Sequence, residues 1–194
     1  MYSTHIPDLY DNHYQSFTMT SSLPPYCCKI VQRLSEALLH NTSLTKLHST
    51  PNNISHIGVA IFATALIYNT SLQELEMGFN EIKCSGAEKL ANGLSHNNSL
   101  KKLELSYNKI KKHGIEKLFH AIGRNSSLEI LILSGNDMSG VENFRELLHC
   151  NTYLKHLELN ETKIGDWEIE KGIKKSGQRY KCTCYTKWAT PPQP

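Results

Sequence analysis

The sequence lacks the features of an exported or membrane-spanning chain. No stretch approaches the roughly 18 consecutive apolar residues that a membrane-spanning helix needs. The first residues, MYSTHIPDLYDNHYQSF, contain no basic start followed by an apolar run, as a secretory signal would. The six cysteines do not have the spacing of a small disulfide-linked scaffold. We therefore expect a cytoplasmic protein with free thiols and no membrane partner.

The sequence is also poor in features of nucleic-acid binding and catalysis. Its net charge is only +3, and its lysine-rich stretches are interrupted by glutamates, which favours solvated helix faces over a nucleic-acid surface. It contains no P-loop, no His-Glu-x-x-His and no Gly-x-Ser-x-Gly. The cysteine pairs Cys27–Cys28 and Cys182–Cys184 lie at opposite ends of the chain, too far apart to share a zinc ion. We expect no enzymatic activity, no cofactor, no metal and no nucleic-acid partner.

One pattern returns at a fixed interval. The chain has SLQELEMGFNEI from Ser71, SLKKLELSYNKI from Ser99 and SLEILILSGNDM from Ser127. The leading leucines of successive units are 28 residues apart, and the last follows after 26; they are Leu44, Leu72, Leu100, Leu128 and Leu154. Self-similarity with a period of 20–50 residues indicates stacked supersecondary units.

Each unit divides into halves with different periods. The first half alternates apolar and polar residues around Leu103 and Leu105, which predicts a short strand. The second half has apolar residues at helical spacing. An asparagine after each of the first four strands is expected to bond the backbone of adjoining turns, and Thr162 replaces it in the fifth unit. A second asparagine ends each helix, where we expect the left-handed conformation. This structural demand explains four of the six Asn-x-Ser/Thr sequons, those at Asn41, Asn69, Asn97 and Asn125.

The pattern L-x-x-L-x-L-x-x-N-x-I followed by an amphipathic helix resembles a leucine-rich repeat, more narrowly the ribonuclease-inhibitor-like subtype found in NOD-like receptors. The resemblance covers about residues 28–175 and implies an α/β horseshoe solenoid with a concave parallel sheet, convex helices and protein-binding function. We expect a flexible N-terminal tail over 1–24, the array with its cap helix over 25–178, and a C-terminal cap strand and tail over 179–194.

The concave face is the predicted contact surface, because residues between the core leucines of a strand point away from the core. Four glutamates are expected to make its middle acidic, and two isoleucines add exposed apolar surface next to two aromatic residues. An apolar patch ringed by carboxylates is typical of a binding hot spot, although solvated charges and strand-favouring isoleucines explain the same pattern. The candidate partner-binding residues are Glu74, Glu76, Phe79, Lys102, Glu104, Tyr107, Ile130, Ile132, His156 and Glu158.

We therefore expect a monomeric, non-enzymatic module that binds a protein partner. Two other interpretations stay open. The chain could regulate a small GTPase by docking, which a GTPase-activation assay would test, or it could be the detached sensor region of an innate-immune-type receptor. The sequence does not identify the partner.

Overall fold

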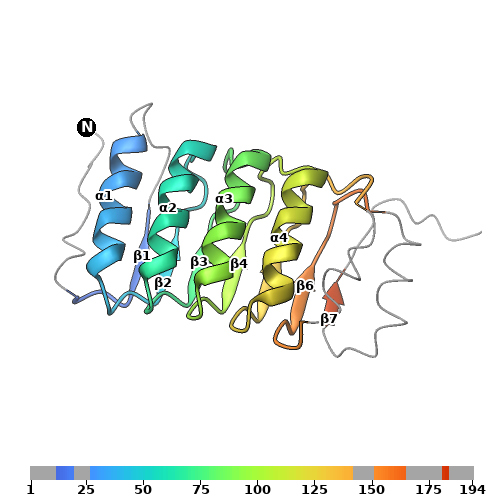
Figure 1. Cartoon of the computed structure of the whole chain (residues 1–194). Coiled ribbons are helices and arrows are strands. Elements are labelled where there is room, and N and C mark those ends of the chain that lie inside the picture. The colour runs from blue at the N-terminus through green and yellow to red at the C-terminus, as the bar shows by residue number, and fades with distance from the viewer. Residues whose placement is uncertain (1–11, 20–26, 142–150, 165–180, 184–194) are drawn as a thin grey trace, which may run out of the picture.

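The computed structural model describes residues 12–19, 27–141, 151–164 and 181–183. Strands and helices alternate from β1 to β5, and neighbours in sequence are neighbours in space (Figure 1). The elements are β1 (Ser16–Thr18), α1 (Cys27–His40), β2 (Lys46–His48), α2 (His56–Tyr68), β3 (Glu74–Glu76), α3 (Lys83–His96), β4 (Lys102–Glu104), α4 (Lys112–Arg124), β5 (Ile130–Ile132), β6 (His156–Glu158) and β7 (Lys181–Thr183).

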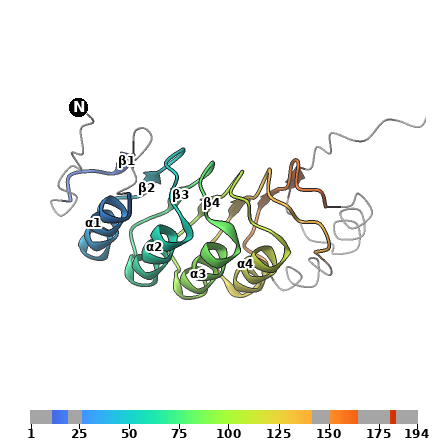
Figure 2. The same cartoon turned by 90° about the horizontal axis from the view of Figure 1, so that it is seen from above.

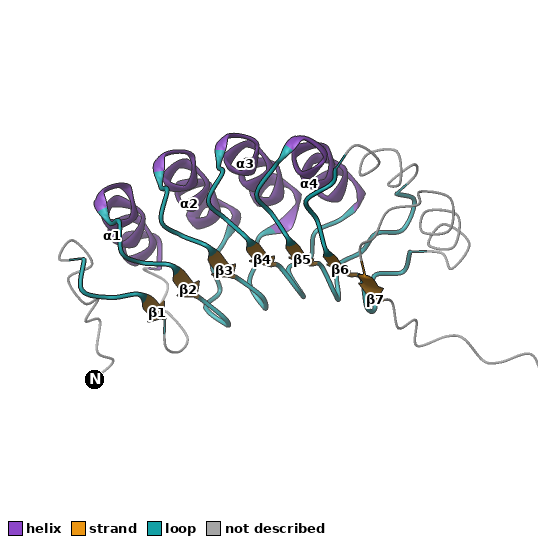
Figure 3. Cartoon of the chain, turned by 90° about the horizontal axis from the view of Figure 1, so that it is seen from below, coloured by secondary structure: helices purple, strands orange, loops and turns teal. Residues whose placement is uncertain are grey.

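The strands form one parallel sheet of seven in the order β1 to β7. The register follows the repeat, since Leu75 lies opposite Leu103 and Leu103 lies opposite Leu131. The helices form a second layer on one side of the sheet (Figure 2). The strands lie on the inner side of the curve and the helices on the outer side (Figure 3). The expected α/β solenoid with a concave sheet and convex helices is confirmed.

The core lies between the two layers and continues from unit to unit. The central leucine of each strand from β2 to β6 is completely buried, and so are the apolar residues on the inner faces of α3 and α4. A short strand or a single amphipathic helix cannot be stable alone, so each unit depends on its neighbours to cover its apolar edges.

Two rows of buried asparagines join the units. Asn80, after β3, donates from Nδ2 to the carbonyl of Ser49 at 2.9 Å, and its Oδ1 accepts the backbone N–H of Ile54 at 2.8 Å. Asn97, after α3, donates to the carbonyls of Leu66 and Asn69 in the preceding unit at 2.7 and 2.9 Å. The expected bonds between adjoining turns are therefore present.

The asparagines that end the helices do not adopt the left-handed conformation that we expected. Asn97 has φ −92° and ψ 131°, and the corresponding asparagines after α2 and α4 are extended too. The residue is needed for its side chain, since Oδ1 of Asn97 accepts the N–H groups of Ser99 and Leu100. Both the nitrogen and the oxygen of the Asn97 amide make hydrogen bonds, and the residue is only 2% exposed. These hydrogen bonds explain why asparagine recurs at this position of the repeat.

The expected N-terminal boundary was wrong. Part of the tail predicted over 1–24 forms β1, which pairs with β2, and Met19 enters the core. This strand covers the apolar edge that β2 would otherwise expose. The helix expected from Tyr26 is present as α1, and β7 lies within the range 179–194 where a cap strand was expected. The expected short helix over 140–150 and the polar helix after Gly165 lie largely outside the described residues.

Candidate functional site

The candidate partner-binding residues on the strands lie in register across the concave sheet. Each three-residue strand has a buried central residue and two outer residues that face away from the core. Glu76, Glu104, Ile132 and Glu158 therefore form one continuous row on β3, β4, β5 and β6. Glu74, Lys102, Ile130 and His156 form the row beside it.

On the N-terminal half of the face, opposite charges neutralise one another. Lys46 pairs with Glu74 at 2.6 Å, while Glu76 binds Lys102 Nζ at 2.5 Å and His48 Nδ1 at 2.6 Å. Burial raises the pKa of Glu76, but hydrogen bonds from Lys102 and His48 outweigh it and place the pKa below its usual value. The same bond to Glu76 raises the pKa of Lys102.

The C-terminal half retains carboxylates without lysine or arginine partners among the described residues. Glu104 Oε1 accepts the backbone N–H of Ser106 at 2.7 Å. Glu158 Oε1 accepts the hydroxyl of Ser134 at 2.8 Å, and His156 Nε2 lies 4.0 Å from Glu158 Oε2. The four-glutamate acidic region predicted from sequence therefore reduces to Glu104 and Glu158.

Ile132 on β5 lies between these two carboxylates, whereas Ile130 on the same strand lies between Lys102 and His156. Ile132 is opposite Glu104 on one side and Glu158 on the other. We expected both isoleucines to be exposed, but they are half-buried, because side chains of the flanking strands lie beside them. They are nevertheless the two aliphatic residues among the outward-facing positions of β2 to β6.

Phe79 and Tyr107 lie just beyond the C-terminal ends of β3 and β4, at one rim of the concave face. Their rings stack at a centroid distance of 4.6 Å and an interplanar angle of 16°. Phe79 is 55% exposed and Tyr107 39%. The Tyr107 hydroxyl donates to Glu161 Oε2 at 3.0 Å, and this bond raises the pKa of the tyrosine. Sequence reasoning identified both aromatic residues but not their stacking.

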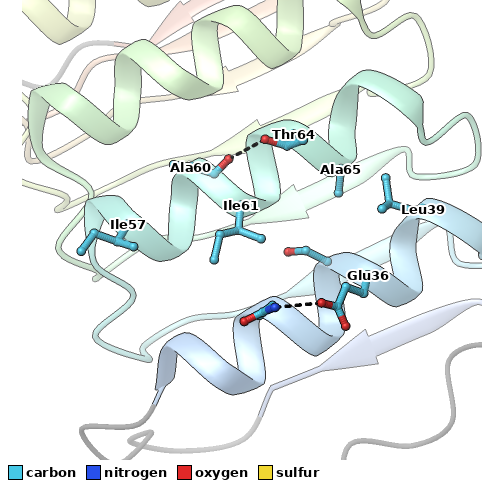
Figure 4. A pocket seen from close by; sticks show the side chains of 9 residues that line it. Glu36, Leu39, Ile57, Ala60, Ile61, Thr64 and Ala65 are labelled. Atoms are coloured by element: carbon cyan, nitrogen blue, oxygen red, sulfur yellow. Dashed lines mark hydrogen bonds between the residues drawn. The ribbon is translucent and has the colours of Figure 1, made fainter.

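Sequence reasoning missed a groove on the convex side, between α1 and α2, with a volume of about 470 Å³. Figure 4 shows Leu39, Ile57, Ile61 and Ala65 along it. Ile57 is 55% exposed. Aligning α2 and α3 on Gly58 and Gly86 would have revealed this surface, since α2 has Ile57, Ala60 and Ile61 where α3 has Ser85, Glu88 and Lys89.

In the part of the chain that the structure describes, no group of three or more His, Cys, Asp or Glu side chains is arranged to hold a metal ion. The helices of that part are also too short or too polar to cross a bilayer.

Comparison with known proteins finds a match for four of the repeats. A family model described as "Leucine Rich repeat" matches residues 68–91, 96–119, 124–141 and 150–166. Among solved structures, one titled "Leiomodin-1 Actin-Binding Site 2 (ABS2)" is similar, with a TM-score of 0.61 and 19% sequence identity over 74% of this chain and 84% of that chain. At that identity the likeness concerns the fold. No curated protein sequence matches the chain.

Proposed function

Because the chain is an α/β leucine-rich-repeat solenoid, we propose that it is a non-enzymatic protein-binding module of the cytoplasm whose concave face contacts the partner. The ribonuclease-inhibitor-like subtype belongs to the proposal and is supported by the 28-residue unit with its full α-helix. A curved sheet held by buried asparagines is a rigid surface, so little conformational entropy is lost when a partner binds it.

The observation that carries the proposal is the pair of half-buried isoleucines on β5, flanked by Glu104 and Glu158. Solvent-facing strand positions favour polar residues, and the equivalent positions on β2, β3, β4 and β6 are polar. Covering Ile130 and Ile132 removes apolar area from water at about 25 cal/mol per Å². Carboxylates at the edge of such a patch orient the partner.

The proposed contact surface is the C-terminal half of the sheet and its aromatic rim. Its centre is Ile130 and Ile132. The ion-paired residues on the N-terminal side contribute shape and register more than net charge, because their charges already neutralise one another. The full set comprises Glu74, Glu76, Phe79, Lys102, Glu104, Tyr107, Ile130, Ile132, His156 and Glu158.

Affinity capture with matched variants tests this proposal. Ile130→Thr with Ile132→Thr keeps β-branched residues on β5 but removes the apolar patch. Ile57→Ser with Ile61→Lys copies the α3 surface onto α2 and changes the convex groove instead. We expect the first pair to abolish capture and the second to retain it, with unfolding temperatures close to wild type. Capture that survives the β5 changes and is lost with the α2 changes would contradict the proposal.

Actin is a second candidate partner, because the similar solved structure is titled an actin-binding site. Co-sedimentation with filamentous actin and binding to monomeric actin test it directly. Binding that is lost with the β5 variant would make actin the concave-face partner. A GTPase-activation assay with the same two variants addresses the small-GTPase alternative.

A further inference from the structure

The aromatic rim occupies positions where the backbone disfavours aromatic residues. Phe79 and Tyr107 have φ of 54° and 53°, in the left-handed region, where a non-glycine residue is strained. Gly135 occupies the equivalent position of the next unit, with φ 70° and no such strain. Glu161 occupies the same position one unit later, with φ 57°, so the position accepts several residue types. What distinguishes Phe79 and Tyr107 is that both are aromatic, exposed and stacked on each other.

The two rings form a preorganised surface, which we call the aromatic platform. Tyr107 lies over Gly135, where a β-carbon would overlap its ring. Its hydroxyl is fixed by Glu161, 54 residues further along the chain. The Phe79 ring stacks on the Tyr107 ring. Side chains held in this way lose little freedom when a ligand covers them.

The Glu104 carboxylate lies at the base of the platform. It contacts Gly78, where a β-carbon would overlap it, and it accepts the N–H of Ser106. Gly78 and Ser106 immediately precede Phe79 and Tyr107 in sequence. Among the described residues, no lysine, arginine or histidine nitrogen forms an ion pair with Glu104, because the nearby Lys102 is bound to Glu76. A negative charge therefore lies beside two exposed, stacked rings.

We propose that the aromatic platform and Glu104 bind an arginine side chain of the partner, next to the apolar residues that cover Ile130 and Ile132. This inference rests on the proposed function. A guanidinium group is planar, so it can stack on an aromatic ring while its edge donates hydrogen bonds to a carboxylate. Lysine has a compact charge and cannot make both contacts with one flat group. Glu158, two strands from Glu104, adds to the negative potential over β5.

The test uses the full chain and a phage-displayed library of random peptides, followed by fluorescence polarisation with synthetic copies of the recovered peptides. We expect the peptides to share an arginine. Replacing it with lysine or with uncharged citrulline should weaken binding about tenfold or more. With Glu104→Gln, the difference between the arginine and citrulline peptides should largely disappear. Ile130→Thr with Ile132→Thr should weaken all the peptides alike.

The outcomes separate the two proposals. Peptides that depend on the isoleucines, yet lose less than about twofold when arginine becomes citrulline, would overturn the arginine site and leave the concave-face function standing. Peptides whose affinity is unchanged by Ile130→Thr with Ile132→Thr, but whose preference for arginine depends on Glu104, would support the arginine site and contradict the role of β5. A library that yields no peptide sensitive to either change counts against both.

Discussion

Replacing Asn80 with alanine tests how strongly the buried amides join the units. The Asn80 side chain is buried and makes hydrogen bonds to five backbone groups. Its Oδ1 accepts the N–H groups of Asn52 and Ile54 in the preceding unit, and its Nδ2 donates to the carbonyls of Ser49, Met77 and Gly78. Alanine leaves all five without this partner.

The magnitude follows from the groups that lose their bonds. A buried N–H without a partner costs about 1–3 kcal/mol, and two are left by the change. Water entering the space and relaxation of the loop recover part of this cost. We therefore expect Asn80→Ala to lower the free energy of unfolding by about 3 kcal/mol, at the upper end of ordinary single substitutions.

Urea denaturation followed by circular dichroism measures this change. Asn98→Ala is the matched control, because Asn98 is exposed and the substitution is the same; its expected effect is within about 0.5 kcal/mol. Thr162, which replaces asparagine in the last unit, provides a second comparison. Among the described residues its hydroxyl makes one bond, to the Leu159 carbonyl, so Thr162→Ala should cost only about 1 kcal/mol. An Asn80→Ala effect as small as that of the Asn98 control would refute the reasoning.

Three further substitutions address the site. Gly135→Ala places a β-carbon against the Tyr107 ring and a non-glycine residue at φ 70°, so we expect a loss of about 1–2 kcal/mol in urea denaturation and weaker peptide binding. Phe79→Gly relieves the backbone strain at position 79 but removes the stacked ring. We expect the free energy of unfolding to change by no more than about 1 kcal/mol, while the affinity for the peptides falls. Unchanged peptide affinity would rule out the aromatic platform. Glu76→Gln removes a carboxylate whose folded-state pKa lies below the ordinary 4.5. Because that pKa is lowered, the ionised Glu76 stabilises the folded state above about pH 4.5, and this stabilisation is lost as the pH falls through the folded-state pKa. The variant should therefore lose less stability than the wild type on acidification. Unfolding temperatures that fall equally in the two proteins as the pH is lowered would contradict this.

The repeat period made the solenoid predictable from sequence. The positions of Leu103, Leu105 and Asn108 recur at the same spacing in the neighbouring units, because each unit contributes to the same continuous core. The pattern of a single unit therefore predicts the strand, its buried face and the row of asparagines. β1 was not predicted because the leucine pattern of the repeat does not surround Phe17. The strand is seen only in the structure, where Phe17 lies opposite Leu47 and β1 covers the edge of β2.

The charge distribution of the site was less predictable, because it depends on side-chain direction. Glu76 and Glu104 occupy the same column of the repeat, yet one turns to Lys102 and His48 while the other turns to the backbone of Ser106. The spacing of residues in the sequence does not predict this difference between Glu76 and Glu104. The Tyr107 hydroxyl likewise donates to Glu161, which lies two units further along the chain.

The concave-face contact is tested most directly by photo-crosslinking. A benzophenone amino acid is placed at position 132 on β5 or at position 61 on α2, and each protein is illuminated with its captured partner. We predict a covalent adduct with the partner from position 132 and none from position 61. Adducts from position 61, with none from position 132, would show that the partner binds the convex helices and would contradict the proposed function.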